Sequence, residues 1–296
     1  MLTSTKAATA QWHKTNYGQC SFVASPMEDV AETELSYQSI NSSDATATIL
    51  LIHGACSSPT EYKLATPFFP KHYHLLIPSL PGHGSSTHIK PFNLPLTCHL
   101  LASLVRKHAT SGQAHIVGVS LGAHVALYLA GHYPDIVLTI FVSGYGRFPP
   151  PSKWVAPLLP YLVCGGQHVT NSLPKPLVRY FMDGASLDLE GTGVRSVQLC
   201  RQIIAVLCST DEVKPVKARC LVVAATKRGV VPSNDSVEDA KVVGRIVRSG
   251  NEESRVVQMR SMRHPWDMQA PGVFAGCVVA WVEGRELPSE MEVVQM

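Results

Sequence analysis

Short apolar runs alternate with longer, helix-like segments along most of the chain. The runs are rich in valine, isoleucine and leucine, and most end close to Gly, Pro or Ser, which is typical of buried strands. This alternation predicts an α/β fold, with a mostly parallel, doubly wound sheet and helices on both faces. Strands are expected at 47–52, 74–78, 115–119, 139–143 and 220–225, and helices at 96–108 and 121–132, the second ended by Pro134.

The alternation stops between residues 147 and 215. This segment opens with the proline-rich run FPPPSKWVAPLLP and continues through helix-like sequence near 176–187 and 194–207. We expect a helical lid here, inserted into a single domain of residues 1–296. The other interpretation is irregular structure packed on the core. The apolar residues of the segment favour either a hydrophobic substrate or a core of the lid itself: Trp154, Val155, Leu158, Leu159, Tyr161, Leu162, Phe181 and Met182.

Composition and charge narrow the class of protein. The 296 residues are 45% hydrophobic and 16% charged, and the net charge of +3 argues against a nucleic-acid partner. No apolar run reaches the length of a membrane span, and residues 1–18 lack the apolar core of a secretory signal. The eight cysteines form no CxxC pair. We therefore expect reduced, mostly buried thiols in a cytoplasmic protein, and the sequence carries no signal for an oligomeric state.

A G-x-S-x-G motif, formed by Gly118, Ser120 and Gly122, lies between the expected strand at 115–119 and the helix at 121–132. In such a turn the Ser side chain is raised above the sheet, and the glycines relieve crowding where strand and helix backbones nearly touch. The helix directs its positive N-terminus at the site, so the N–H of Leu121 is a candidate oxyanion donor. The competing interpretation is a glycine-rich turn in which Ser120 caps the helix.

Three motifs, in this order along the chain, resemble the α/β-hydrolase superfamily: HGAC at 53–56, SLPGHGSS at 79–86 and GVSLG at 118–122. The resemblance implies a mostly parallel, doubly wound sheet with a helical lid, at 147–215, inserted after the sixth core strand. It also implies a second oxyanion donor directly after the first motif's His-Gly pair. That donor is expected to be the N–H of Ala55, with the N–H of Cys56 as the alternative.

The same resemblance points to a general base and to a displaced acid. The base of the family lies on a loop after the last strand, and His264 fits, between a strand-like run at 255–259 and a helix at 271–283. The commonest position of the acid is occupied here by Arg228, whose charge would oppose an imidazolium. Asp235 is the nearest replacement.

The role of Asp235 has competitors. Glu238 and Asp239 fall in the next helical turn and are weaker candidates for the acid. Asp235 itself can be interpreted as a helix N-cap, because Asp-Ser-Val-Glu resembles a capping box. The block at 221–288 resembles a branch of fungal α/β-hydrolases found in biosynthetic pathways, and that resemblance favours Asp235 as the acid.

Ser120, His264 and Asp235 together predict a serine hydrolase that needs no metal or organic cofactor. It would cleave an ester, thioester or lactone of a small, hydrophobic substrate through an acyl-enzyme, with the N–H groups of Leu121 and Ala55 holding the oxyanion. The resemblance adds a role in secondary-metabolite biosynthesis. His53 is expected to support its turn rather than to act as the base.

Two alternative functions keep the fold. The first is a non-hydrolytic enzyme that catalyses acyl transfer, C–C cleavage, dehydration or cyclisation, and the displaced acid favours it. The second is a ligand-binding receptor that uses the lid as a switch. The presence of both Ser120 and His264 argues against the receptor, because a protein that only binds needs neither.

Overall fold

The computed structural model describes residues 33–172, 174, 176, 196–209, 213–228 and 234–296. The chain divides into two compact units, Met1–Glu34 and Leu35–Met296. Every helix and strand named below belongs to the second unit.

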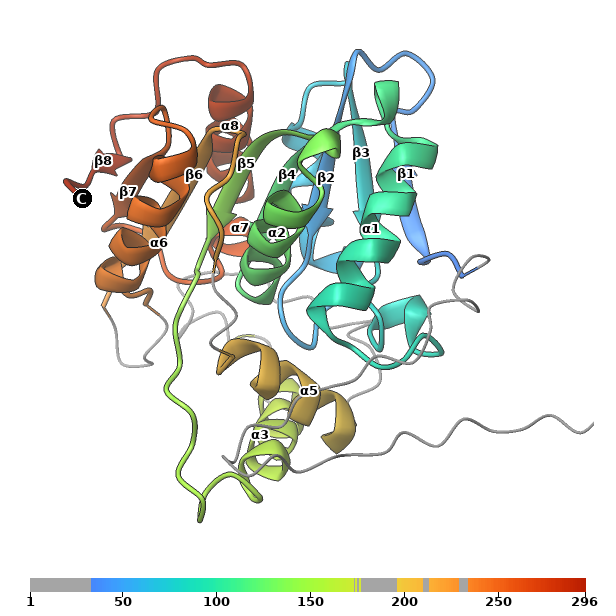
Figure 1. Cartoon of the computed structure of the whole chain (residues 1–296), viewed down its shortest axis with the longest axis vertical. Helices are drawn as coiled ribbons and strands as arrows, with labels where there is room; N and C mark the ends of the chain where they lie inside the picture. The colour runs from blue at the N-terminus through green and yellow to red at the C-terminus, as the bar shows by residue number, and fades with distance from the viewer. Residues whose placement is uncertain (1–32, 173, 175, 177–195, 210–212, 229–233) are drawn as a thin grey trace, which may run out of the picture. The chain divides into compact units, whose positions relative to one another are not determined.

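An eight-stranded sheet forms the centre of this unit, with the strand order β1-β3-β2-β4-β5-β6-β7-β8 (Figure 1). Neighbouring strands are parallel except at the two edges, where β1 pairs with β3 and β8 pairs with β7 in antiparallel fashion. The α/β fold with a mostly parallel sheet is therefore confirmed. The strands are β1 (Tyr37–Ile40), β2 (Ala47–Ile52), β3 (Tyr73–Pro78), β4 (Ala114–Val119), β5 (Val137–Ser143), β6 (Cys220–Ala225), β7 (Arg255–Met259) and β8 (Glu292–Val293).

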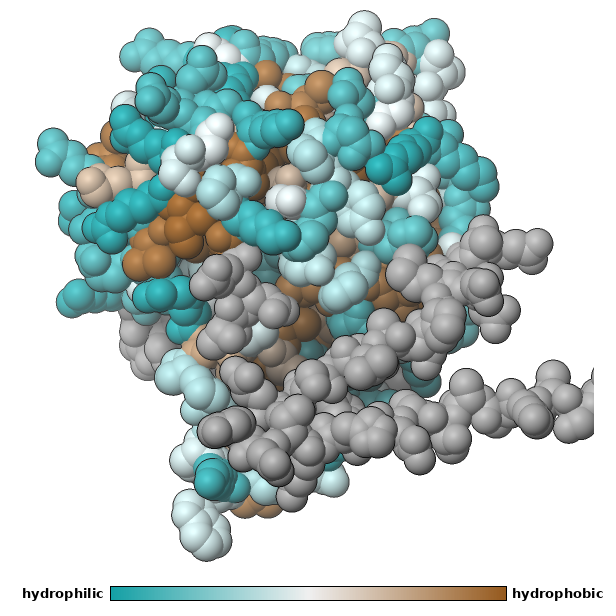
Figure 2. Space-filling view, in the orientation of Figure 1, coloured by the Kyte–Doolittle hydropathy of each residue, from teal (hydrophilic) through white to brown (hydrophobic). Residues whose placement is uncertain are grey.

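Helices cover both faces of the sheet. On one face lie α1 (Leu94–His108), α2 (Leu121–His132) and α6 (Val237–Gly250), and on the other lies α8 (Pro271–Val282), preceded by the short α7 (Trp266–Gln269) (Figure 1). Because both faces are covered, the interior strands are continuous apolar runs rather than alternating ones. Hydrophilic side chains cover most of the described surface around α1, α2 and α6, with smaller apolar areas between them (Figure 2).

The core beneath α8 is aromatic. Phe274 and Trp266 pack with Phe141 of β5 and with Tyr62 of the 3-10 helix η2 (Pro59–Tyr62), and the ring centroids are 5.1 to 6.3 Å apart. The indole N–H of Trp266 donates to the hydroxyl oxygen of Ser143 at 2.7 Å. The packing and this bond hold η2, α7 and α8 against the carboxyl end of the sheet.

Two described helices lie between β5 and β6, at the carboxyl edge of the sheet: α3 (Leu159–Ser172) and α5 (Val197–Leu207) (Figure 1). Four described strands precede β5, so this insertion follows the fifth strand of the structure rather than the sixth that the resemblance implied. Residues 177–195, with Phe181 and Met182, lie outside the described residues. The lid at 147–215 therefore stays an expectation.

The apolar residues expected either to bind substrate or to form a core of the lid are mostly exposed. Trp154 is 90% exposed, Leu158 61% and Leu162 64%. Within the described residues these side chains therefore form no lid core. None of the described helices is both long and apolar enough to cross a membrane, and the seven described cysteines form no disulfide.

Candidate active site

The carboxyl ends of the parallel strands meet at one edge of the sheet and position the predicted site residues. β2 ends directly before His53, and β4 ends directly before Ser120. The segments that follow β6 and β7 carry Asp235 and His264. In open α/β sheets this is the edge at which ligands bind.

Ser120 lies in a strained turn between β4 and α2. Its φ of 56° is in a region that residues other than glycine rarely adopt. Glycine is required at positions 118 and 122 because other backbone atoms approach both residues closely. A Cβ on Gly118 would lie 2.2 Å from the carbonyl oxygen of Gly122, and a Cβ on Gly122 would lie 2.1 Å from that of Ile52. The Ser120 side chain makes no capping bond to α2, so the interpretation of Ser120 as a helix cap is wrong.

Both predicted oxyanion donors lie in segments beside Ser120. Leu121 is the first residue of α2, where backbone N–H groups have no partner inside the helix. Ala55 and Cys56 form a turn after β2. A Cβ on Gly54, the residue before this turn, would lie 3.4 Å from the Cβ of Ser120. The turn therefore passes directly beside the candidate nucleophile.

The side chains of Asp235 and His264 are in direct contact. Nδ1 of His264 lies 2.6 Å from Oδ1 of Asp235, and Oδ2 of Asp235 accepts the N–H of Ala225 at 2.7 Å. The backbone N–H of Asp235 donates to the carbonyl of Ala225 at 2.7 Å. Asp235 is thus folded back onto the end of β6, where its buried carboxylate makes Nδ1 the protonated nitrogen of His264 and Nε2 the basic one.

The structure separates Asp235 from its competitors. The N-cap of α6 is Ser236, whose hydroxyl accepts the N–H of Asp239 at 3.1 Å, so the N-cap interpretation of Asp235 is wrong. Glu238 pairs with Lys241 at 2.9 Å, and Asp239 pairs with Arg147 at 3.1 Å. Arg228, at the commonest position of the acid, is exposed.

His264 and Ser120 both adjoin the residues at the end of β5. The N–H of Ser120 donates to the carbonyl of Ser143 at 2.8 Å. The next residue, Gly144, has a φ of +72°, and a Cβ there would lie 2.6 Å from Cε1 of His264. Burial alone would lower the pKa of His264, but its bond to Asp235 and the charges of Asp235 and Glu61 raise that pKa above its ordinary value.

The other histidines near the site are neutral. Nδ1 of His53 donates to the carbonyl of Gly54 at 2.9 Å, and Nε2 accepts the N–H of Leu80 at 3.1 Å. Burial, with a contribution from His83, lowers the pKa of His53 to about 3. Both ring nitrogens of His53 are used in holding backbone, which fits the support role expected for it.

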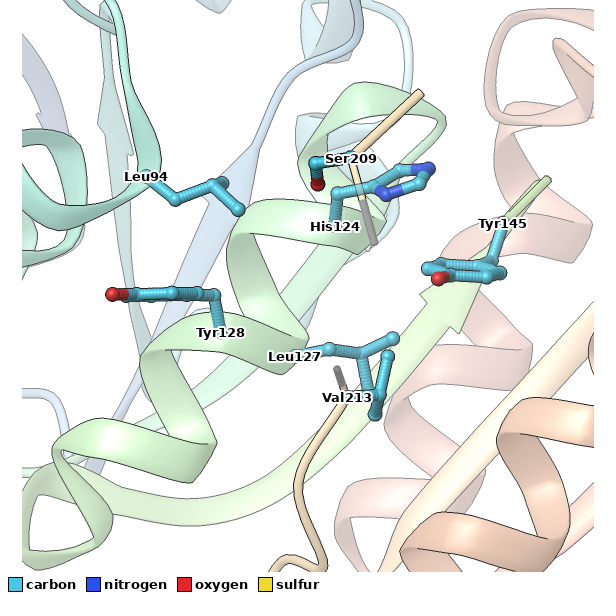
Figure 3. Close-up of a pocket in the computed structure, with 7 residues that line it drawn as sticks. All are labelled: Leu94, His124, Leu127, Tyr128, Tyr145, Ser209 and Val213. Atoms are coloured by element: carbon cyan, nitrogen blue, oxygen red, sulfur yellow. The ribbon is translucent and has the colours of Figure 1, made fainter. Parts of the chain in front are cut away.

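A small pocket lies beside the helix that follows Ser120. His124 of α2 faces Tyr145, which follows β5, and the ring centroids are 4.2 Å apart (Figure 3). Burial lowers the pKa of His124 to about 4, so this imidazole is neutral. The pocket has a volume of about 20 Å³, which accommodates a water molecule rather than an acyl group. Its lining is completed by Leu94, Leu127, Tyr128, Ser209 and Val213.

Sequence reasoning missed two buried carboxyl groups next to this site, Glu61 of η2 and Asp267 of α7. Burial raises the pKa of Glu61 to about 7. Burial, and then the charge of Glu61, raise the pKa of Asp267 well above its ordinary value, against the opposing effect of the backbone N–H groups of Asp267 and Met268. In the sequence, Glu61 is followed by the buried Tyr62, and Asp267 is preceded by the buried Trp266. These aromatic neighbours are the signal from which the burial of the two acids could have been inferred.

Within the described part of the chain, no group of three or more His, Cys, Asp and Glu side chains is arranged to hold a metal ion. The groups that the described chain places at this edge include a hydroxyl, an imidazole, carboxylates and backbone N–H groups. A strained serine beside a carboxylate-bound imidazole is suited to nucleophilic attack on an electrophilic carbon or phosphorus.

Several known proteins resemble this chain in sequence or in structure. Residues 49–276 match the sequence model of the Alpha/beta hydrolase family. An AB hydrolase superfamily protein from Gibberella zeae is 38% identical over 267 residues, which cover 90% of each chain. A pimeloyl-acyl-carrier protein methyl ester esterase from Neisseria meningitidis is 32% identical over 100 residues, 34% of this chain and 37% of that protein. A hydrolase of known structure from Pseudomonas aeruginosa has a TM-score of 0.64 at 18% identity, covering 93% of this chain and 98% of the other.

Proposed function

Because this chain belongs to the alpha/beta hydrolase family, we propose that it is a serine hydrolase with Ser120 as nucleophile, His264 as general base and Asp235 as the acid that orients the base. The family and its esterase relatives support a hydrolase. The observation that carries the finer proposal is the 2.6 Å contact between Nδ1 of His264 and Oδ1 of Asp235. The backbone bond of Asp235 to Ala225 turns the carboxylate towards the imidazole of His264. Stability alone does not readily explain this arrangement.

Acylation begins when Nε2 of His264 takes the proton of the Ser120 hydroxyl. The oxygen then attacks the substrate carbonyl, and the N–H groups of Leu121 and Ala55 bind the oxyanion of the tetrahedral intermediate. When the intermediate collapses, the bond to the leaving alcohol or thiol breaks, and that group receives the proton from His264. Asp235 holds the imidazole in the required tautomer and stabilises its charged form.

Deacylation repeats these steps with water. His264 removes a proton from a water molecule, which attacks the acyl-enzyme carbonyl, and the same N–H groups bind the second oxyanion. The ester bond to Ser120 then breaks, Ser120 regains its proton from His264, and the carboxylic acid leaves. The cycle consumes one water and needs no cofactor.

The proposed substrate is a small molecule with an ester, thioester or lactone and a hydrophobic portion. The methyl ester esterase relative supports an ester, and the apolar residues at the carboxyl edge, such as Leu158 and Leu162, support a hydrophobic portion. The likeness of 221–288 to fungal biosynthetic α/β-hydrolases supports a place in secondary-metabolite biosynthesis, and a cytoplasmic location is part of the same proposal.

The test is intact-mass spectrometry after treatment with a fluorophosphonate probe. The Ser120 oxygen bonds to phosphorus as the P–F bond breaks, fluoride leaves and the proton passes to His264. We expect one adduct on the wild type, none on Ser120→Ala, and labelling slowed on the order of a thousandfold in Asp235→Asn. Asp239→Asn is the matched control, because Asp239 pairs with Arg147 instead, and it should label within about twofold of the wild type.

Two results would overturn the proposal. A folded wild type that gains no adduct would show that Ser120 is not an activated nucleophile. Normal labelling of Asp235→Asn, or slow labelling of Asp239→Asn, would show that the acid is assigned to the wrong residue.

A further inference from the structure

Glu61 holds the backbone next to the proposed oxyanion donor. The N–H of Gly54 donates to both carboxylate oxygens of Glu61, at 3.0 and 3.1 Å. A Cβ on Gly54 would lie 3.4 Å from Oε2 of Glu61 and 3.4 Å from the Cβ of Ser120. The Gly54 backbone is thus enclosed between the acid and the candidate nucleophile, one residue before Ala55.

The helix that carries Glu61 is itself fixed to the core. The hydroxyl of Tyr62 donates to the carbonyl of Ile52, at the end of β2, at 2.8 Å. The Tyr62 ring stacks on Phe274 with centroids 6.0 Å apart. Ser58 caps the start of this helix by accepting the N–H of Thr60. The carboxylate of Glu61 is therefore placed by rigid neighbours and does not depend on a mobile side chain.

Three titratable groups interact electrostatically with Glu61: His264 from the loop after β7, Asp267 from α7, and Tyr62 from its own helix. Of these, His264 is the one that becomes positively charged. Burial raises the pKa of Glu61 to about 7, and the charge of Glu61 helps to raise the pKa of His264. Burial, and then the charge of Glu61, raise the pKa of Asp267 well above its ordinary value.

We propose that Glu61 is a positioning residue of the Ser120 site, which holds the turn carrying the Ala55 amide through Gly54 and places a negative charge beside His264. The inference rests on the proposed function, since it concerns the same Ser120 site. A buried carboxylate that is bound by a backbone N–H and the Ser57 side chain, and has no permanent positive partner, is costly to the fold, whereas orienting an oxyanion donor and stabilising an imidazolium are uses that require it.

Two substitutions separate the two parts of this role. Glu61→Gln keeps the volume and an oxygen that accepts the Gly54 N–H, but it removes the charge. Glu61→Leu also fills the volume, but it leaves the Gly54 N–H without an acceptor. Glu283→Gln is the matched control, because Glu283 is a partly exposed carboxylate that accepts the hydroxyl of Tyr73 at 3.2 Å.

The measurement is the rate of fluorophosphonate labelling between pH 5.5 and pH 9 for all four proteins. Labelling requires neutral His264, so the rate rises with pH as His264 loses its proton. In Glu61→Gln this rise should occur at lower pH than in the wild type, with the rate at pH 8.5 within about threefold. Glu61→Leu should lose on the order of ten- to a hundredfold at every pH, because the oxyanion turn is no longer anchored. Glu283→Gln should match the wild type.

The outcomes separate this inference from the proposed function. If the wild type is not labelled at Ser120 at any pH, the proposed function fails first. If the wild type is labelled and the Glu61→Gln profile superimposes on it, Glu61 does not act on His264 and the proposal is overturned. Glu61→Gln keeps the volume and one acceptor oxygen for the Gly54 N–H and is expected to fold, so it decides the question even if Glu61→Leu does not fold.

Discussion

At the scale of single residues, the surroundings of each titratable group decide what it can do. Burial lowers the pKa of His53 to about 3 and that of His124 to about 4, so both are neutral imidazoles that hold backbone or pack against aromatic rings. His264 is an imidazole of the same kind, but Asp235 raises its pKa. A histidine is therefore identified as a candidate base by the carboxylate at its Nδ1, not by its presence near the site.

Glu61 should make the stability of the fold depend on pH. The folded protein keeps the proton of Glu61 up to about pH 7, whereas the unfolded chain loses it near the ordinary value of 4.5. Between these values the folded state binds more protons, so the free energy of unfolding falls as pH rises, by up to about 3 kcal/mol in total. Glu61→Gln has no ionisable group at this position, so its free energy of unfolding lacks this fall with pH. Urea denaturation at pH 5 and pH 7.5 should therefore show the variant gaining stability relative to the wild type at the higher pH.

A constant difference in stability between Glu61→Gln and the wild type would contradict this prediction. It would mean that Glu61 is ionised in the folded protein across the whole range. Glu283→Gln, measured in parallel, corrects for the loss of one negative charge from the molecule.

At the scale of elements, the start of α6 places a helix cap and the proposed acid in adjacent positions. Ser236 caps the helix through the N–H of Asp239, while Asp235 turns back to β6 and His264. The two roles compete for the same short stretch of sequence, because Asp and Ser are both good N-caps. Here the residue with the longer reach to the sheet is the proposed acid, and its neighbour is the cap.

Ser236→Ala should separate these roles. Loss of the N-cap is expected to lower the free energy of unfolding by about 1 kcal/mol, measured by urea denaturation. The fluorophosphonate labelling rate should remain within about threefold of the wild type, because Asp235 is held by Ala225 rather than by the cap. If Ser236→Ala labelled as slowly as Asp235→Asn, the position of the acid would depend on the helix start.

At the scale of the whole molecule, large apolar residues occupy two different environments, the buried core and the exposed surface. Phe274 lies fully buried among Tyr62, Phe141 and Trp266, in the layer between the sheet and α8. Trp154, before α3, is 90% exposed. The sheet and its covering helices therefore account for the stability of the described unit, and the apolar residues around 154–162 do not.

A pair of alanine substitutions measures this difference. Phe274→Ala should lower the free energy of unfolding by about 3 to 5 kcal/mol, because it leaves a cavity in the aromatic core. Trp154→Ala should change it by less than about 0.5 kcal/mol. Both are read from chemical denaturation. A large loss of stability in Trp154→Ala would show that the 154–162 segment is packed in solution.

Much of the sheet could be predicted because its signals are local. The interior strands were predicted to within two residues at each end, since a strand covered on both faces must be apolar throughout. The edge strands β1 and β8 have mostly exposed or half-buried residues, so they carry no such run and were not predicted. The strained turn at Ser120 was predicted because the G-x-S-x-G motif is local, although only Gly118 meets backbone of the same turn, whereas Gly122 meets the carbonyl of Ile52 in β2.

The sequence by itself determined the fold class and the turn that presents Ser120, because both follow from short-range patterns, and it made His264 a candidate base through the resemblance to the α/β-hydrolase superfamily. The tertiary structure alone decided that Asp235 rather than Asp239 meets His264, that Ser236 is the helix cap, and that Glu61 lies behind Gly54. The physical reason is that a single carboxylate side chain has many possible partners. Which partner it meets, and whether water remains around it, depends on chain segments far apart in sequence that only folding brings together.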